Sequence, residues 1–282
     1  MDIREFREVA CRYKVVFFDA YGVLKNSQGV LDGIGRTFEF LLAESIDFYV
    51  VTNDASRGPV ELAQVYIDQG LPMITSDKII SSGMLATEYL RLKVRSGTVA
   101  YLGTEKSAHY LEELGLHTLS IADLDLDAVD GVNALVFLDD EGFAWSRDLN
   151  KIVNLLRLRN IPCVVANTDR SYPVSDRAVS IAVGSIADMV ERITGRQFIK
   201  FGKPDAQMFI FAYEHTQRAL EVGKENILMV GDTLTTDIIG GNKFGIDTAL
   251  VLSGNTLREA VLEQIHSTGI VPDYICESAV ID

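Results

Sequence analysis

The chain has 282 residues, which is enough for one large domain or two. Apolar residues make up 48% of it and charged residues 23%, an ordinary globular composition that excludes a disordered or fibrous chain. The net charge of −14 argues against a nucleic acid or an anionic membrane as partner, because both bind basic surfaces. A small phosphorylated ligand needs only a local positive site and stays compatible.

The N-terminal segment lacks the pattern of a secretory signal. Residues 1–14 are charged and lack the apolar stretch of about 7–15 residues that is typical of a secretory signal. No apolar run in the chain reaches the roughly 18 residues of a membrane span. Cys11, Cys163 and Cys276 lie far apart and form no CxxC pair, so a reduced compartment is expected. We therefore expect a cytoplasmic protein.

Short apolar runs alternate with helical patterns along the chain. The runs are rich in Val, Ile, Phe and Tyr, as is typical of parallel strands buried on both faces, and they lie at 14–18, 48–51, 98–102, 134–138, 162–166, 227–230 and 248–252. Segments of helical period lie between them, for example at 36–44, 59–69, 107–114, 149–159 and 187–194. This alternation predicts an α/β fold with parallel sheets.

Polar residues follow the predicted strands near the two ends of the chain. They are Asp19, Thr52–Asn53 and Gly231–Asp232, whereas the middle of the chain, roughly residues 85–180, forms a second α/β set. This distribution predicts a discontinuous core that is interrupted by an inserted domain.

Three carboxylates are candidates for a metal site. Asp19 and Asp232 each follow a predicted strand, and Asp237 comes five residues later. Ligands of open parallel sheets bind at the carboxyl ends of the strands, so these side chains are expected to meet there. Converging carboxylates repel one another and call for a hard cation such as Mg²⁺. Any one Asp alone is equally explained as a helix cap or turn residue, but the three together indicate a metal.

A cation and a polar loop complete the candidate site. Lys203 precedes a proline, which favours an extended conformation, and its ammonium would keep a nucleophile ionised and bind a transferring phosphoryl group. A solvated surface lysine is the alternative. The Thr52 hydroxyl and the Asn53 amide, with backbone N–H groups at a following helix start, predict an anion cradle.

These residues resemble the four motifs of the haloacid-dehalogenase superfamily. The motifs are Asp19-x-x-Gly22-Val23-Leu24, Thr52-Asn53-x-x-Ser56-Arg57, Gly202-Lys203-Pro204 and Gly231-Asp232-x-x-x-x-Asp237. Their order and spacing are similar to those of the class IIA phosphatases, which include p-nitrophenyl, pyridoxal, nucleotide and sugar-phosphate phosphatases. The resemblance covers nearly the whole chain, including Asn167-Thr168-Asp169, Tyr172-Pro173 and Gly184-Ser185.

The resemblance implies a fold and an activity. The fold is a Rossmann-like parallel-sheet core over residues 1–82 and 182–282, with an inserted α/β cap over residues 83–181. The activity is Mg²⁺-dependent hydrolysis of a small phosphate monoester, such as a sugar, nucleotide or cofactor phosphate. Asp19 would be the nucleophile and would form an aspartyl-phosphate.

The resemblance also assigns ligands to the phosphate and the metal. Thr52 and Lys203 would hold the phosphoryl oxygens, and the rest of the cradle, Asn53, Asp54 and Arg57, would adjoin them. Mg²⁺ would bind the Asp19 carboxylate, the Tyr21 backbone carbonyl, Asp232 and Asp237.

The first motif departs from the family at Tyr21. The family's phosphatases have a second Asp here, which protonates the leaving group and then activates water. A phenol with a reference pKa of about 10 donates hydrogen bonds but is a poor base near pH 7. Loss of acid–base help typically costs about 10²–10⁴-fold in rate. Hydrolysis is therefore expected to be slow, or restricted to good leaving groups.

Two alternatives remain open. Asp19-x-Tyr21-Gly22 also resembles the first motif of the true haloacid dehalogenases, but only 29 residues separate Gly22 from Thr52, too few for their helical cap. A phosphate-binding or regulatory protein with little catalysis is the other alternative.

The cap contains one further candidate. Asp139–Trp145 follows a predicted strand, at the place where class IIA caps position specificity residues. Trp145 is the only tryptophan, and it either stacks on a sugar or base ring or packs in the cap core. Caps of this class often take part in dimer contacts, so a homodimer is compatible with the resemblance.

Overall fold

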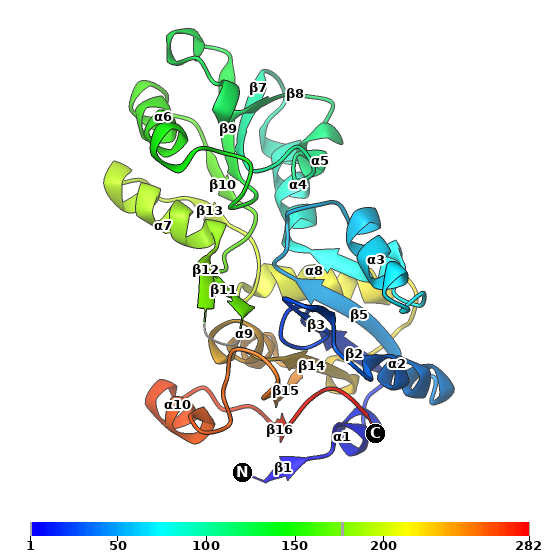
Figure 1. The fold of residues 1–282 in the computed structure, drawn as a ribbon. Coiled ribbons are helices and arrows are strands. Elements are labelled where there is room, and N and C mark those ends of the chain that lie inside the picture. The colour runs from blue at the N-terminus through cyan, green and yellow to red at the C-terminus, as the bar shows by residue number, and fades with distance from the viewer. Residues whose placement is uncertain (1, 176–177, 282) are drawn as a thin grey trace.

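Two parallel sheets form the molecule, as Figure 1 shows for the computed structural model, which describes residues 2–175 and 178–281. The larger sheet has seven strands in the order β1-β16-β15-β14-β2-β5-β6, and every neighbouring pair is parallel. The smaller sheet has five parallel strands in the order β13-β10-β9-β7-β8. The predicted α/β architecture, a parallel-sheet core with a second α/β unit, is confirmed.

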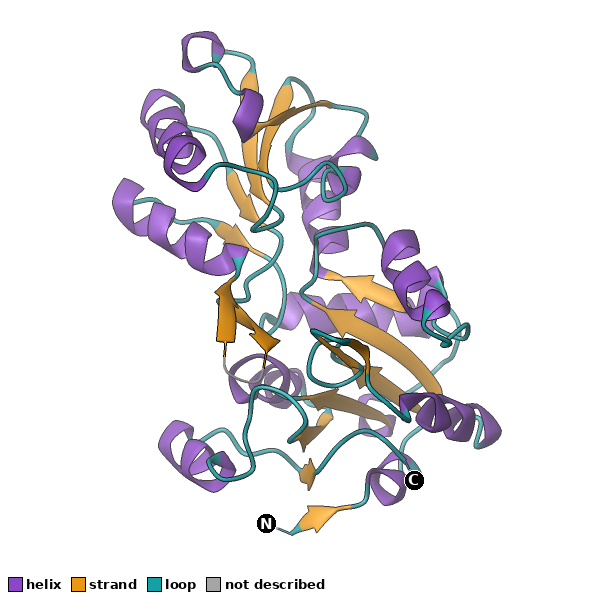
Figure 2. Ribbon diagram, in the orientation of Figure 1, coloured by secondary structure: helices purple, strands orange, loops and turns teal. Residues whose placement is uncertain are grey.

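The larger sheet draws its strands from both ends of the chain. Its strands are β1 (Ile3–Arg4), β2 (Val15–Phe18), β5 (Asp47–Thr52), β6 (Ile79–Ser81), β14 (Ile227–Gly231), β15 (Asp247–Val251) and β16 (Tyr274–Cys276). The helices around it are α1 (Phe6–Ala10), α2 (Ile34–Ala43), α3 (Pro59–Asp68), α8 (Ala206–Gln217), α9 (Ile239–Phe244) and α10 (Val261–Thr268). A small antiparallel flap, β3 (Lys25–Asn26) and β4 (Gly29–Val30), follows β2. Figure 2 shows this layer of strands with helices on both sides.

The smaller sheet comes from the middle of the chain. Its strands are β7 (Thr98–Leu102), β8 (His117–Ser120), β9 (Val132–Phe137), β10 (Cys163–Val165) and β13 (Ile199–Lys200). Its helices are α4 (Ser82–Lys93), α5 (His109–Glu112), α6 (Trp145–Leu158) and α7 (Val183–Thr194). An antiparallel hairpin of β11 (Ser171–Ser175) and β12 (Ala178–Ile181) extends from this unit toward the larger sheet (Figure 1).

The sequence predicts that the cap ends at residue 181, but two later elements, α7 and β13, pack with the smaller sheet. Strand β13 pairs with β10, and the buried face of α7, which includes Val183 and Ile186, packs in the apolar cluster of the smaller sheet. The sequence gives α7 and β13 the same helix and strand patterns as core elements, so their sheet could not be read from the pattern. We propose that the cap extends to Lys200.

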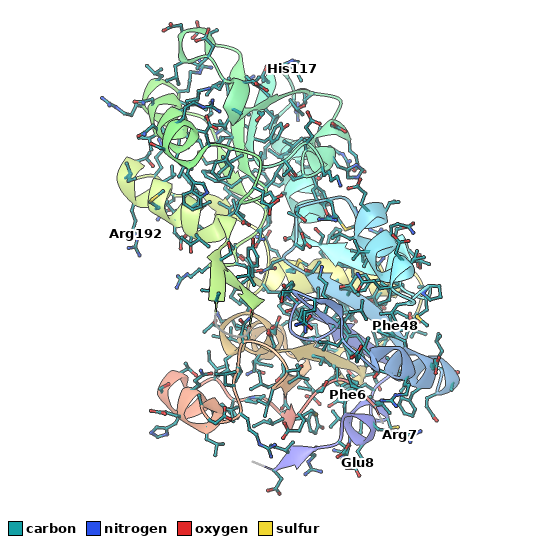
Figure 3. The ribbon with its side chains drawn as sticks, in the orientation of Figure 1. Phe6, Arg7, Glu8, Phe48, His117 and Arg192 are labelled. Carbon is teal, nitrogen blue, oxygen red and sulfur yellow. The ribbon has the colours of Figure 1, made fainter. Side chains whose placement is uncertain are left out.

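Apolar side chains fill both faces of each sheet. Phe6 and Phe48, labelled in Figure 3, belong to the cluster on one face of the larger sheet. A second cluster contains Phe17 and Met229 of the larger sheet together with Val99 and Val136 of the smaller one, so the two units share a continuous apolar contact. His117 and Arg192, also labelled in Figure 3, are exposed on the cap.

The topology determines where polar side chains gather. Strands β5, β2 and β14 are neighbours and all run the same way, so their carboxyl ends share one edge, where the cap faces the larger sheet. Among the described residues there is no helix with the length and apolar character needed to cross a membrane.

Candidate active site

A cleft of about 1100 Å³ lies between the carboxyl edge of the larger sheet and the cap. The core contributes residues that the sequence singled out, namely Asp19, Tyr21, Thr52, Asp54, Arg57, Lys203 and Asp232. The cap contributes mainly polar residues, among them Asp139, Asp140, Glu141, Asp169, Arg170 and Tyr172. The predicted strand-end residues are therefore brought together, and the cap closes over them.

The three predicted carboxylates converge, and two of them, Asp19 and Asp232, line this cleft, whereas Asp237 does not line it. Asp19 follows β2, Asp232 follows β14, and Asp237 lies in the short helical turn after it, with ligand oxygens all within 4.8 Å of one another. Asp232 is 1% exposed and Asp237 is fully buried. Burial, and then the charge of Asp19, raise the pKa of Asp232; burial also raises the pKa of Asp237, although Lys203 opposes this.

A small divalent cation fits this cluster. Oδ1 of Asp237 is buried and has no hydrogen-bond partner among the described residues, although it lies near the Lys203 ammonium. Three carboxylates that supply only oxygen donors are the set that Mg²⁺ prefers. A cation would stabilise the ionised form of carboxylates whose pKa values are raised by burial and by the charge of Asp19.

The chain around Asp232 is built to hold this carboxylate in place. Its Oδ2 accepts a hydrogen bond of 2.7 Å from Asn255 N, and its Oδ1 accepts one of 2.7 Å from the Thr233 hydroxyl. A Cβ at Gly22 or Gly254 would lie 2.0 or 1.9 Å from Asp232 Oδ2. Glycine is required at both positions because the backbone approaches the carboxylate so closely, and Gly22 also has a φ of +82°.

Lys203 is the buried cation of the site. Its Nζ lies 2.5 Å from Asp19 Oδ1 and 2.9 Å from Asp237 Oδ1, and the side chain is 2% exposed. Burial alone would lower the pKa of the ammonium, but the charges of Asp19 and Asp237 outweigh it and raise the pKa above its usual value. The ammonium therefore stays protonated, and Lys203 is not a surface lysine.

The loop after β5 forms one wall of the cleft. Thr52 is 5% exposed, and its hydroxyl accepts a hydrogen bond of 3.1 Å from Asp54 N. The Asp54 carboxylate accepts hydrogen bonds from the backbone N and the hydroxyl of Ser56, at 2.9 and 2.6 Å, and lies 3.7 Å from Lys25 Nζ. Thr52, Asp54 and Arg57 all line the cleft, as expected of the predicted cradle.

Asn53 is placed differently from the prediction. Its side chain is 1% exposed and is not among the residues that line the cleft. Its amide is bonded to the backbone of Lys203 and to Asp169 instead. The amide is therefore engaged within the protein, and the expectation that it contacts phosphate is corrected. The sequence could not reveal this, because both partners are more than a hundred residues away.

Tyr21 follows β2 and contacts the cap. Its ring centroid lies 6.3 Å from that of Tyr172 on β11, nearly perpendicular to it, and the Tyr172 hydroxyl donates a 2.9 Å hydrogen bond to Asp140 Oδ2. Burial raises the pKa of Tyr21, and a hydrogen bond with Ser27 partly offsets this. Near neutral pH the phenol is therefore protonated and is no base.

Two cap carboxylates line the cleft without having been predicted as site residues. Asp169 accepts a 2.8 Å hydrogen bond from Asn53 Nδ2, and burial raises its pKa to about 6 despite the opposing charge of Lys203. Burial, and then the charge of Asp140, raise the pKa of Asp139 to about 6. The segments containing Asp139 and Asp169 were visible in the sequence, but their convergence depends on the folding of the cap.

Trp145 does not line the cleft. It is the first residue of α6, is 45% exposed, and its ring contacts Phe143 at a centroid distance of 6.0 Å. The stacking role considered for it is therefore not supported by its position.

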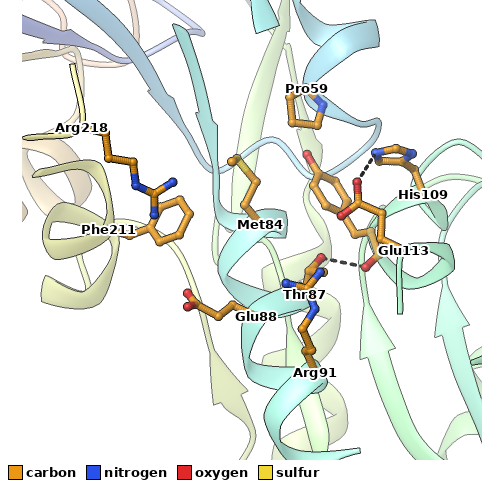
Figure 4. A pocket seen from close by; sticks show the side chains of 10 residues that line it. Pro59, Met84, Thr87, Glu88, Arg91, His109, Glu113, Phe211 and Arg218 are labelled. Carbon is orange, nitrogen blue, oxygen red and sulfur yellow. Dashed lines mark hydrogen bonds and ion pairs between the residues drawn. The ribbon is translucent and has the colours of Figure 1, made fainter. Parts of the chain in front are cut away.

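A second, smaller hollow of about 270 Å³ lies among α3, α4, α5 and α8 and is drawn in Figure 4. It is lined by apolar side chains such as Met84 and Phe211 and by charged ones such as Arg91 and Arg218. His109 lies 3.4 Å from Glu113 across its rim. The cluster of three possible metal ligands lies at the first cleft and not at this hollow.

Comparisons with known proteins indicate the family of the chain. A haloacid dehalogenase-like hydrolase model matches residues 16–117, and a HAD-hydrolase-like model matches residues 200–279. Chronophin from Bos taurus is 32% identical over 283 residues, which cover 96% of this chain and 93% of that protein.

Two solved structures extend the comparison. A possible sugar phosphatase of the HAD superfamily from Cytophaga hutchinsonii is 57% identical, with a TM-score of 0.96 over 100% of this chain and 99% of that chain. A glycerol phosphate phosphatase from Mycobacterium tuberculosis, solved in complex with magnesium, shares the fold at 23% identity, with a TM-score of 0.77 over 99% of this chain and 78% of that one.

The parallel core with its cap is the architecture of a hydrolase of the haloacid dehalogenase type. The chain belongs to the haloacid dehalogenase-like hydrolases, and the resemblance of the four motifs is confirmed.

Proposed function

We propose that the protein is a Mg²⁺-dependent phosphatase of small phosphate monoesters that acts through an aspartyl-phosphate on Asp19. The observation that carries the proposal is the arrangement of Asp19, Lys203, Asp232 and Asp237 at a cleft large enough for a metabolite. The solved relative at 57% identity is described as a possible sugar phosphatase, which supports a monoester substrate.

Asp19, the Tyr21 backbone carbonyl, Asp232 and Asp237 would hold the metal ion. When bound, Mg²⁺ neutralises charge on the carboxylates and on the phosphoryl group that they face. The magnesium in the Mycobacterium tuberculosis relative is consistent with this assignment.

The residues of the chain have separate tasks in two displacements. A carboxylate oxygen of Asp19 attacks phosphorus, and the bond from phosphorus to the leaving-group oxygen breaks, with its electron pair going to that oxygen. Water then attacks the same phosphorus, the bond to Asp19 breaks, and the carboxylate and inorganic phosphate are released. Lys203 and the Thr52 hydroxyl hold the phosphoryl oxygens in both displacements, and Arg57 and the backbone of the Asp54 loop adjoin them.

Because of Tyr21, the rate of hydrolysis depends strongly on the leaving group. The phenol is protonated near neutral pH, so no base takes the place of the carboxylate that the family's phosphatases have here. A leaving group that departs as a stable anion needs no acid, whereas an alkoxide does. Aryl phosphates are therefore hydrolysed faster than alkyl phosphates, and water attack on the aspartyl-phosphate is slow.

The substrate is a small phosphorylated metabolite, such as a sugar, nucleotide or cofactor phosphate. Sequence and site together favour this class over nucleic acid, because the net charge of −14 attracts no polyanion while Lys203 binds a single phosphoryl group. The cap supplies the wall that contacts the leaving group, through Asp139, Asp140 and Tyr172.

A screen of sugar, nucleotide, cofactor and p-nitrophenyl phosphates, with Mg²⁺ and with EDTA, tests this function. Phosphate release that disappears with EDTA supports it. Phosphate binding without turnover would indicate a binding or regulatory protein instead. Halide release from haloacids without metal would indicate the dehalogenase class.

A further inference from the structure

Asn53 occupies the junction between the two units. The chain passes from the core to the cap at Ser81–Ser82, between β6 and α4, and returns at Phe201–Lys203, between β13 and α8. Asn53 follows β5, directly after Thr52, and its side chain is 1% exposed. A buried amide must find partners for its donors and its acceptor, and the partners of Asn53 come from several segments.

The first partner is the backbone of Lys203. Lys203 N donates a 2.7 Å hydrogen bond to Asn53 Oδ1, and Asn53 Nδ2 donates a 3.0 Å hydrogen bond to Lys203 O. One side chain therefore holds both backbone groups of the catalytic lysine. The fit is tight, since a Cβ on Gly202 would lie 2.6 Å from Asn53 Oδ1.

The second set of partners belongs to the cap. Asn53 Nδ2 also donates to Asp169 Oδ1 at 2.8 Å, and it lies 3.4 Å from the Thr168 hydroxyl, which itself donates to Lys203 O at 2.9 Å. Residues 166–169 follow cap strand β10. The same amide thus contacts the lysine backbone and the end of a cap strand.

The segment by which the chain passes from the core to the cap also contacts Asn53. The Ser82 hydroxyl lies 3.0 Å from Asn53 O and 2.5 Å from Ala166 O, and Ser82 is fully buried. Both crossings between core and cap therefore meet Asn53, as does the end of β10.

We propose that Asn53 is a positioning residue that sets the backbone of Lys203 and couples it to the cap through Asp169. The inference rests on the proposed function, in which the Lys203 ammonium acts on the phosphoryl group. A lysine has a flexible four-carbon stem, so the place of its ammonium depends on how firmly its backbone is held. A shift of about 1 Å in a catalytic group can cost roughly 10²-fold in rate. The amide suits this task because its donor and its acceptor are on separate atoms, so it can bond Lys203 O and Lys203 N at the same time.

A double-mutant cycle on vanadate inhibition tests whether Asn53 acts through Lys203. Asn53→Ala and Lys203→Ala are each expected to weaken inhibition by about 10-fold or more, and the double variant is expected to be no weaker than Lys203→Ala, because Asn53 acts through the lysine. Asn242→Ala is the matched control: its amide donates to Val271 O at 2.9 Å outside the cleft, and inhibition is expected to stay at the wild-type level.

Two outcomes of the cycle overturn the inference. One is wild-type inhibition in Asn53→Ala, and the other is a double variant weakened by the full product of the two single effects. Wild-type inhibition in Lys203→Ala is a different failure, since it contradicts the proposed function and removes the basis of the inference with it.

A swap of donor and acceptor tests the coupling to the cap and does not depend on Asn53→Ala being folded. Asn53→Asp keeps the acceptor for Lys203 N but places two carboxylates together, so kcat is expected to fall about 10-fold or more with a smaller change in KM. Adding Asp169→Asn returns a donor to the pair, and it should recover a large part of that loss. Failure to recover kcat overturns the coupling through Asp169.

Discussion

The two walls of the cleft are built by different means. The core wall includes charged side chains that are nearly inaccessible, namely Lys203 at 2% and Asp232 at 1% exposure, and each is bonded to another part of the site. The cap wall includes side chains that are largely in contact with solvent, such as Arg170, which is 81% exposed. The geometry of the reacting groups is thus fixed by one edge of a parallel sheet, whereas the surroundings of the leaving group depend on a separate unit.

This difference predicts a graded response to substitution. A change in the core wall leaves a buried charge without its partner, which is severe for both catalysis and local structure. A substitution in the cap wall affects a side chain that water can solvate, so it is expected mainly to alter the preference among substrates.

The largest effect is expected at the nucleophile. Asp19→Asn keeps the size of the side chain, but an amide cannot attack phosphorus, so turnover of p-nitrophenyl phosphate should fall by at least about 10³-fold. Asp188→Asn, an equally conservative change on the cap, where Asp188 pairs with Lys200 at 2.7 Å, should retain most of the turnover. Similar losses in both variants would contradict the separation of the two walls.

The metal site is next. Asp232→Asn removes one of three carboxylates, so Mg²⁺ affinity measured by calorimetry should fall by about 10²-fold. The Asn255 and Thr233 hydrogen bonds can still form to the amide oxygen, and circular dichroism should report a folded protein. Equal Mg²⁺ affinity in variant and wild type would mean that the metal binds elsewhere.

Tyr21 stands between the two walls, and its effect depends on the substrate. Tyr21→Asp supplies the missing acid–base group, so turnover of an alkyl phosphate should rise by about 10-fold or more, with a smaller gain for p-nitrophenyl phosphate. Tyr21→Phe retains a ring beside Tyr172 and supplies no carboxylate, so it should bring no such gain. A slower alkyl reaction in Tyr21→Asp would show that the phenol itself takes part in catalysis.

The smallest effect concerns stability and the cap. The pKa of Asp139 is raised to about 6, above its ordinary value, so its ionised form is disfavoured in the folded state. The folded protein binds more protons than the unfolded one between these two values, and this contribution to the free energy of unfolding falls as pH rises through the window. Asp139→Asn has no carboxyl group and therefore avoids the free-energy cost of ionising one in the folded state. After allowance for partial exposure, it should be more stable by about 1 kcal/mol at pH 8.

Urea denaturation at two pH values checks this prediction. The advantage of Asp139→Asn at pH 8 should largely disappear near pH 3, where the carboxyl group of the wild type is mostly protonated in both the folded and the unfolded state. The same advantage at both pH values would contradict an electrostatic origin.

The core wall could be predicted from the sequence, and the reason is physical. Strands that are buried on both faces, such as β2 and β14, are continuous apolar runs, and parallel strands place the residues that follow them at one edge. All seven apolar runs form strands. Strands β6 and β16 have only three residues each and were not predicted, since such short runs carry no clear period.

The cap wall could be predicted only in part. The sequence marked the segment from Asp139 to Trp145, but it could not indicate that Asp139 lines the cleft while Trp145 does not. Nor could it indicate that β13 joins the smaller sheet or that the Asn53 amide holds the backbone of Lys203. Each of these facts depends on a contact between segments far apart in the chain, and neither composition nor period records such contacts.

Rapid acid quenching of the protein during turnover of p-nitrophenyl phosphate, followed by mass analysis of its peptides, tests whether Asp19 forms the aspartyl-phosphate. The account predicts one phosphoryl group on the peptide that contains Asp19, and none in the Asp19→Asn variant. Because water attack is slow without a carboxylate at position 21, this species should accumulate in the wild type and decline in Tyr21→Asp. A phosphoryl group on another residue, or an Asp19→Asn variant that releases phosphate at the wild-type rate, would contradict the account.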